Sequence, residues 1–225
     1  MRRKAALLPM IAATLALTVS GCVDIPDAAP KHRPVRQSTA QFSPRPETRQ
    51  CLSQLGATRA NFTPLPDQYF GAGCTALGTV QLASLSSDDT RLALSNIGPV
   101  TCPLAQTFAG WARFGVDRAA RQILGSALVR IETMGSYNCR NVAGSSRRSA
   151  HATANAIDVS GFVLADGRRI TVLGNWTQGT AREREFLGAI HASACKRFGT
   201  VLGPAYNVAH RDHLHVELSG NAYCR

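Results

Sequence analysis

Histidines and one aspartate with the spacing of metal ligands are the residues of this chain that could do chemistry. His151 and Asp158 form a His-x6-Asp pair, and residues 210–215 near the C-terminus read His-Arg-Asp-His-Leu-His. Two imidazoles and one carboxylate can hold a zinc ion and leave a coordination position for water, as a metallohydrolase requires. The sequence therefore predicts one Zn²⁺ as the cofactor. Histidines with purely structural hydrogen bonds are the alternative.

The C-terminal histidines lie on a segment with the alternation of a half-buried strand. One face of residues 213–218 would carry His213, His215 and Glu217, and the apolar residues between them would face a core. Glu217 is then placed to orient an imidazole through a hydrogen bond, as carboxylates near metal-bound histidines do. His210 precedes this strand and is expected either behind the ligands or at the surface.

Asp158 lies on a second expected strand, residues 156–162, where its apolar neighbours point to the opposite face. A carboxylate beside a core needs a positively charged partner. A metal ion would be that partner, and a salt bridge to Arg147 or Arg148 is the alternative.

The elements that must position these residues indicate an α+β domain. Further strands are expected at residues 80–85, 91–94, 127–134 and 169–172. Helices are expected from Pro103 to Gly125, and from a Thr180/Glu183 capping box to Phe198. We therefore expect a single domain with a small, mainly antiparallel sheet packed by helices.

The N-terminus resembles the signal of a bacterial lipoprotein. Three basic residues at 2–4 precede an apolar run that is short for a membrane span, and Val-Ser-Gly-Cys at 19–22 resembles a lipobox. Residues 1–21 are expected to be a signal peptide and Cys22 the acylated residue, with an ordinary secretory signal as the alternative. No acidic residue directly follows Cys22, so enterobacterial sorting favours the outer over the inner membrane, on the periplasmic side.

Residues 22–49 are expected to tether the domain to the membrane. They are rich in proline and basic residues and poor in large apolar ones, so they bury too little surface to order themselves. Residues 50–225 then form the domain, which is long enough for one core. The net charge of +11 fits an anionic cell wall and membrane surface rather than nucleic acid in an exported protein.

Six of the seven cysteines remain beyond Cys22, and an even number in an exported chain predicts disulfides. Sequence alone leaves the connectivity open. Our hypothesis is sequential pairing: Cys51 with Cys74, Cys102 with Cys139, and Cys195 with Cys224. The chain has no CxxC pair, which argues against zinc held by thiolates.

From Cys51 to Arg225 the chain resembles the bacterial extensin-like C-terminal domain family. The resemblance is carried by residues 136–140, 149–161, 166–167, 195, 198–207, 210–218 and 223–225. The metal motif is also similar to that of zinc peptidases grouped around lysostaphin, D-alanyl-D-alanine carboxypeptidases and the hedgehog fold, in which a later single His follows the His-x6-Asp pair. This implies His151, Asp158 and His215 as ligands of one zinc ion.

The same resemblance implies roles for the neighbours of these ligands. Asp212 matches the acidic base of carboxypeptidase relatives and His213 the first histidine of a His-x-His element, so we assign Asp212 as base and His213 as transition-state stabiliser. Exchanged roles stay open, because either group can transfer a proton near neutral pH. Arg140 matches an arginine that receives a substrate carboxylate, for which a guanidinium fork is suited; an ordinary surface arginine is the alternative. The family's usual glycine between the first two ligands is Ala154 here, which matters only if this position needs a positive φ.

The expected function is zinc-dependent hydrolysis of peptidoglycan stem peptides or crosslinks, as a carboxypeptidase or an endopeptidase. The expected partners are peptidoglycan and, through the lipid anchor, the membrane, with no role for nucleic acid. Three protein ligands favour catalysis, because structural zinc is normally closed by four. The alternative is a noncatalytic cell-wall binding or scaffold domain that keeps the metal for folding.

Overall fold

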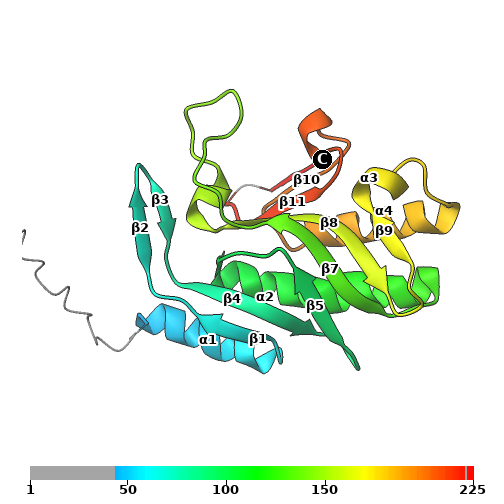
Figure 1. Cartoon of the computed structure of the whole chain (residues 1–225), viewed down its shortest axis with the longest axis horizontal. Coiled ribbons are helices and arrows are strands. Elements are labelled where there is room, and N and C mark those ends of the chain that lie inside the picture. The colour runs from blue at the N-terminus through cyan, green and yellow to red at the C-terminus, as the bar shows by residue number, and fades with distance from the viewer. Residues whose placement is uncertain (1–43, 221) are drawn as a thin grey trace, which may run out of the picture. The chain divides into compact units, whose positions relative to one another are not determined.

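A mixed β-sheet with helices on one face forms the centre of the molecule (Figure 1). The computed structural model describes residues 44–220 and 222–225. The predicted signal peptide, the lipidation site Cys22 and most of the predicted tether lie outside the described residues. No helix within the described ranges combines the length and apolar character that crossing a bilayer requires.

The first helix begins inside the segment predicted as tether. Helix α1 (Pro46–Ala57) has proline at its first turn, where the missing amide hydrogen costs nothing and the fixed φ suits a helix. Helix α1 therefore spans the boundary expected between residues 49 and 50.

The main sheet has ten strands in the order β1-β4-β5-β7-β8-β11-β10-β12, with β6 paired to β4 and β9 to β8. The strands are β1 (Asn61–Pro64), β4 (Thr79–Ser86), β5 (Arg91–Ser95), β6 (Val100–Thr101), β7 (Leu128–Gly135), β8 (Ala156–Leu164), β9 (Arg169–Thr171), β10 (Thr200–Leu202), β11 (Leu214–Glu217) and β12 (Tyr223–Cys224). A separate hairpin consists of β2 (Gln68–Gly71) and β3 (Cys74–Ala76).

The predicted α+β class is confirmed, but the sheet is larger than the small one expected. Pairs β5–β7 and β10–β12 are parallel, and the other pairs are antiparallel. Several added strands span only two or three residues. Alternation cannot be recognised over so short a length, which explains why they were missed.

Both predicted long helices form. Helix α2 (Cys102–Trp111) continues through the π-helical segments η1 (Ala112–Asp117) and η2 (Ala120–Leu124) and ends at a left-handed Gly125. Helix α4 (Ala181–Cys195) starts at the predicted capping box, in which Thr180 and Glu183 each bond the other's backbone amide. The remaining helical turns are α3 (Val172–Asn175), η3 (Ala150–Thr153) and η4 (Val208–His210).

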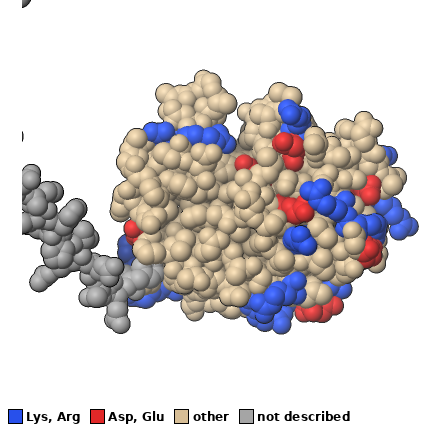
Figure 2. Space-filling model, in the orientation of Figure 1, with Lys and Arg blue, Asp and Glu red and all other residues tan. Residues whose placement is uncertain are grey.

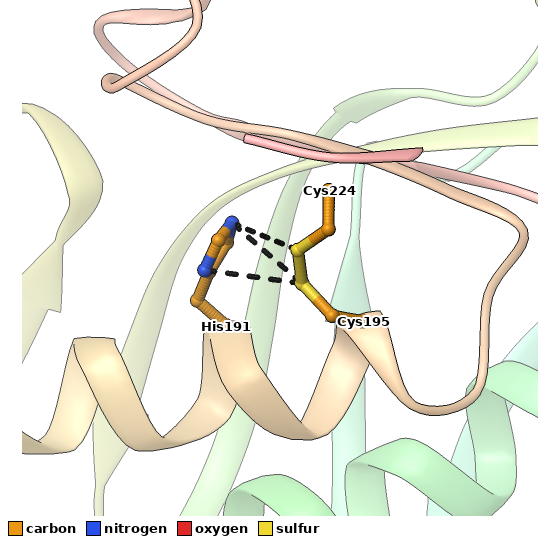
Figure 3. A group of neighbouring side chains, drawn as sticks. All are labelled: His191, Cys195 and Cys224. Atoms are coloured by element: carbon orange, nitrogen blue, oxygen red, sulfur yellow. Dashed lines mark hydrogen bonds between the residues drawn. A yellow bond between two sulfur atoms is a disulfide. The ribbon is translucent and has the colours of Figure 1, made fainter. Parts of the chain in front are cut away.

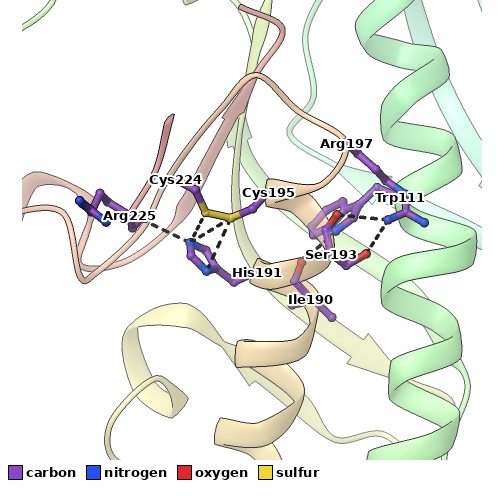
Figure 4. Close-up of a disulfide and its surroundings, with 8 residues drawn as sticks. All are labelled: Trp111, Ile190, His191, Ser193, Cys195, Arg197, Cys224 and Arg225. Carbon is purple, nitrogen blue, oxygen red and sulfur yellow. Dashed lines mark hydrogen bonds between the residues drawn. A yellow bond between two sulfur atoms is a disulfide. The ribbon is translucent and has the colours of Figure 1, made fainter. Parts of the chain in front are cut away.

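The core lies between the sheet and helices α2 and α4, which cover one face of it (Figure 1). Trp111 is fully buried and its indole nitrogen donates a hydrogen bond to the Ile190 backbone oxygen at 3.1 Å (Figure 4). The rings of Trp111 and Phe162 form a T-shaped contact with their centroids 6.3 Å apart. On β8 and β11 the alternate residues that face this core are completely buried: Ile157, Val159, Leu214 and Val216. Their strand neighbours, including Asp158 and His215, therefore project from the opposite face.

Three disulfides brace the described chain, and they correct two of the predicted pairings. The bonds join Cys51 to Cys102, Cys74 to Cys139, and Cys195 to Cys224. Only the last was expected. The first links α1 to α2, which pack together, and the second links the β2–β3 hairpin to the loop that precedes η3. Such long-range neighbours follow from tertiary packing and cannot be inferred from spacing.

Candidate metal centre

His151, Asp158 and His215 come from three elements and converge on the face opposite the helices. His151 lies on η3, and the antiparallel pairing of β8 with β11 places His215 directly opposite Asp158. His151 Nε2 lies 3.1 Å from His215 Nδ1 and 3.2 Å from Asp158 Oδ1. His215 Nδ1 lies 2.9 Å from the same carboxylate oxygen. Tetrahedral zinc with bonds of about 2.1 Å spaces its ligand atoms roughly 3.4 Å apart, so one ion fits among these three atoms after a small expansion.

Hydrogen bonds behind the two histidines leave their inward nitrogens as lone-pair donors. His151 Nδ1 donates to the Ser136 backbone oxygen at 3.1 Å, and His215 Nε2 donates to Glu217 Oε2 at 3.0 Å. A neutral imidazole carries one N–H, so in the neutral form of both rings His151 Nε2 and His215 Nδ1 face each other and Asp158 with lone pairs. These lone pairs repel unless a metal ion or a proton lies between them, and a proton there forms the hydrogen bond to Asp158. Metal-ligating histidines have such partners on the outer nitrogen.

The protonation of this group shows the same demand for positive charge. Burial disfavours the Asp158 carboxylate, but hydrogen bonds from His151 and His215 outweigh this and hold the pKa of Asp158 far below its ordinary value. Burial lowers the pKa of His215, but its bonds to Asp158 and Glu217 have the larger combined effect and raise this pKa to about 9. The cluster therefore attracts a cation, which can be a proton or a metal ion.

His213 and Asp212 form a hydrogen-bonded pair beside the three ligands. His213 Nδ1 donates to Asp212 Oδ1 at 2.8 Å, and His213 Nε2 lies 3.5 Å from Asp158 Oδ1. The imidazole thus stands between Asp212 and the centre. The hydrogen bond from His213 lowers the pKa of Asp212, so this carboxyl is a weak base. Of the two residues, His213 therefore adjoins the candidate ligands, and Asp212 contacts it from behind.

His210 packs against the same histidines from η4. Its ring centroid lies 5.1 Å from that of His213 and 6.0 Å from that of His215. Its Nδ1 donates to Asn207 Oδ1 at 2.7 Å. Burial first, then the neighbouring histidines and Arg140, lowers the pKa of His210 to about 4. His210 is therefore neutral at pH 7 and lines the centre without charging it.

The arginines considered as partners of Asp158 do not form salt bridges with it in the described residues. Among the described residues, Asp158 forms its ion pairs with histidines rather than with arginine. Arg148 instead donates to the Ala72 backbone oxygen at 2.6 Å and to Asn141 Oδ1 at 2.8 Å. Arg140 is exposed and close enough to His210 for its charge to act there.

Ala154 occupies a position that does require a positive φ. It ends η3 with φ 55° and ψ 26°, and its side chain is buried. Its amide donates to the His151 backbone oxygen at 3.1 Å, which closes the turn between the first two ligands. Alanine adopts this left-handed conformation at a cost of about 1 kcal/mol that glycine avoids. The chain keeps the turn despite this cost.

A second group of ligand-type residues lies at the end of α4 (Figure 3). Donor atoms of His191, Cys195 and Cys224 all lie within 4.8 Å of one another. The two sulfurs are joined in a disulfide, and His191 Nε2 donates to the Arg225 backbone oxygen at 3.3 Å (Figure 4). Cysteine binds a metal ion as a thiolate, so the bonded sulfurs are unavailable as ligands and this group is a structural brace.

Two contributors to the site were missed in the sequence. The first is the Ser136 carbonyl that orients His151; a backbone acceptor leaves no trace in residue type. The second is Asn207, which caps η4 by accepting from the Ala209 amide and also bonds His210. An asparagine three residues before a histidine is a weak capping signal that could have indicated it.

Comparison with known proteins gives one match. Residues 49–225 match the family described as Extensin-like protein C-terminus. The matched range contains the three candidate ligands, their hydrogen-bond partners and all three disulfides. No curated protein matches the chain, and no solved structure does.

Proposed function

The chain belongs to the extensin-like C-terminal family, and we propose that it is a zinc-dependent peptidase that cleaves stem peptides or crosslinks of peptidoglycan. The observation that carries the proposal is the convergence of His151 Nε2, His215 Nδ1 and the Asp158 carboxylate, with lone pairs directed at one point. Three protein ligands leave a tetrahedral ion one open position, as in catalytic zinc sites. The likeness of the motif to lysostaphin-type zinc peptidases supports the same assignment.

Bound zinc would supply a Lewis acid that polarises a peptide carbonyl and makes a water molecule more acidic. The proton of the attacking water then needs an acceptor within reach. His213 has that position, because its Nε2 faces the ligands while Asp212 holds its Nδ1–H. His213 would pass the same proton to the leaving amine. Asp212 stays ionised and stabilises the imidazolium that forms between these steps.

Substrate orientation falls to Arg140 in this proposal. Its guanidinium is exposed, and its charge reaches His210 at the edge of the centre. A guanidinium fork binds a carboxylate through two parallel hydrogen bonds. Arg140 would therefore receive a carboxylate of the peptide whose neighbouring bond is cleaved.

The choice of peptidoglycan rests on where the chain is expected to be. The lipoprotein-like N-terminus, the proline-rich basic tether and a net charge of +11, or +8 after Arg2, Arg3 and Lys4 are removed (11 − 3), all suit a protein held near an anionic wall. Three disulfides fit an oxidising compartment. We infer a periplasmic lipoprotein, anchored by Cys22, whose tether lets the domain search the wall.

The test uses the mature chain with Cys22→Ser, loaded with zinc and incubated with purified muropeptides. Mass spectrometry of the products should show loss of a terminal residue or opening of a crosslink. Product should disappear after chelation and return when zinc is restored. Stoichiometric zinc without any product, under conditions where the protein is folded, would instead favour a noncatalytic wall-binding domain.

A further inference from the structure

A short antiparallel arm, residues 140–149, stands beside the metal centre. Its two sides are joined by hydrogen bonds from the Ser149 amide to the Arg140 oxygen at 3.1 Å and from the Val142 amide to the Arg147 oxygen at 2.9 Å. Side chains alternate between the two faces of such a pair. Arg140, Val142, Arg147 and Ser149 therefore share one face of the arm.

The other face of the arm is already in use. Asn141 and Arg148 lie opposite each other as a bridge pair, and Arg148 donates to Asn141 Oδ1 and to the Ala72 backbone oxygen. The Cys74–Cys139 disulfide fixes the base of the arm to the same β2–β3 hairpin. This face is therefore turned to the hairpin, and its arginine has structural partners.

The face with Arg140 and Arg147 is turned to the metal centre. Ser149, on that face, accepts a hydrogen bond from the His151 amide at 3.4 Å. The opposite face contacts the β2–β3 hairpin through Arg148, which donates to the Ala72 backbone oxygen. Arg140 and Arg147 therefore project from the side of the arm that adjoins η3 and the candidate ligand His151.

Neither arginine is neutralised by the protein. Within residues 44–220 and 222–225, no carboxylate forms a salt bridge with Arg140 or Arg147, and both residues are exposed. Arginines remote from the centre, such as Arg113 and Arg118, are paired with Asp88. Figure 2 shows basic side chains gathered at the base of the arm. Arg140 Nη1 donates to the Asn141 backbone oxygen at 3.4 Å, a contact that leaves its charge without a carboxylate partner. Both guanidinium charges are therefore available to an anionic ligand next to the candidate catalytic centre.

We propose that Arg140 and Arg147 bind two carboxylates of a single peptide, so that the enzyme selects dianionic substrates. Diagonal neighbours across an antiparallel pair lie about 7–8 Å apart, and side chains of this length span a range of carboxylate separations. The inference deepens the proposed function, on which it rests, and adds Arg147 as a second residue that determines specificity.

The experiment measures peptide binding to the zinc-loaded mature chain carrying Cys22→Ser and His213→Gln, which is expected to slow turnover enough for binding to be measured. The probes are a tetrapeptide with one terminal and one side-chain carboxylate, and its two monoamidated forms. Isothermal titration should give an affinity that falls roughly 10-fold to 100-fold on either amidation, as expected for a lost charged hydrogen-bond pair.

Adding Arg147→Gln should weaken binding of the doubly charged peptide to a similar degree. In this variant, amidation of the carboxylate that Arg147 binds should no longer lower the affinity, while amidation of the other carboxylate still should. Arg140→Gln should show the same pattern with the two carboxylates exchanged. Arg182→Gln, which removes an exposed charge from α4, is the matched control and should leave all three affinities unchanged. Equal melting temperatures and zinc content establish that the variants are folded.

The inference is overturned if Arg147→Gln binds all three peptides as the parent does, or if both amidation penalties survive in it. Cleavage is scored separately with His213 intact. Absence of product together with the predicted binding pattern contradicts the proposed function alone. Equal cleavage of all three peptides contradicts dianion selection alone.

Discussion

Two clusters of metal-ligand residues in this molecule differ in whether their electron pairs are free. One consists of His151, Asp158 and His215, and the other of His191, Cys195 and Cys224. In the first, three lone-pair donors point at each other with no covalent bond between them. In the second, the sulfurs are joined to each other. Proximity of suitable residue types is therefore insufficient, and the partners that each donor already has distinguish a candidate metal site from a brace.

The contacts behind the histidines extend this contrast. At the first cluster, the outer N–H groups of His151 and His215 donate to oxygen acceptors, so in the neutral rings the other nitrogen of each imidazole directs its lone pair inward. At the second, the rings of His191 and Trp176 form a T-shaped contact with their centroids 5.6 Å apart. Burial lowers the pKa of His191. His191 is thus a neutral packing residue that also holds the C-terminal backbone.

The largest expected effect comes from removing one histidine from each cluster. His215→Ala should lose stoichiometric zinc and all zinc-dependent hydrolysis, because only two ligands remain. His191→Ala should keep one zinc and near-parental activity. Metal analysis and muropeptide turnover on both variants check this. Zinc lost from His191→Ala but kept in His215→Ala would reverse the roles of the two clusters.

His213→Gln separates metal binding from proton transfer at the first cluster. Zinc should be retained, since His213 is beside the ligands rather than among them, while kcat falls roughly 10²-fold to 10⁴-fold through loss of the base. Asp212→Asn should reduce kcat less, because it only disturbs the orientation of His213. A larger loss in Asp212→Asn than in His213→Gln would restore Asp212 as the base.

The second cluster should matter for stability alone. Replacing both Cys195 and Cys224 by serine opens a bond with a sequence separation of 29 residues, which is expected to lower the free energy of unfolding by about 3–4 kcal/mol. Denaturant unfolding measures this, and zinc content serves as the internal control. If the zinc content fell while the protein remained folded, the brace and the metal centre would not be independent.

The pH dependence of stability tests the charge demand of the first cluster. After chelation, the raised pKa of His215, about 9 against 6.5 in an unfolded chain, stabilises the fold fully below pH 6.5. This contribution is lost as pH rises through 9 and amounts to at most about 3 kcal/mol. His191 and His210, whose pKa values are lowered, change the free energy of unfolding only below pH 6.5, outside this range. Zinc-loaded protein should lack the decline between pH 6.5 and 9, because the metal replaces the proton; equal profiles would contradict this.

The sequence was most informative where a pattern had a single physical cause. Alternation predicted the strands that carry Asp158 and His215, because every second residue there is buried in the core. The capping box predicted the start of α4 from Thr180 and Glu183, which contact each other locally. Features of this kind depend on neighbouring residues only and can be read along the chain.

Features that depend on distant segments could not be predicted. Two disulfide pairings were assigned wrongly, because spacing reveals neither that α1 lies against α2 nor that the β2–β3 hairpin lies against the loop before η3. The pairing that puts Arg140 and Arg147 on one face depends on the register of the arm. The order of His213 and Asp212 around the centre likewise needed their hydrogen bond. In each case residue type was informative and tertiary arrangement decided the role.

Zinc K-edge X-ray absorption on the loaded mature chain tests the central claim most directly, because it distinguishes the ligands of the two clusters. The account predicts a single shell of nitrogen and oxygen at about 2.0–2.1 Å, with two imidazoles and one open position filled by solvent or substrate. A sulfur contribution near about 2.3 Å, or failure to retain one zinc per chain, would contradict the assignment of His151, Asp158 and His215 as the metal centre.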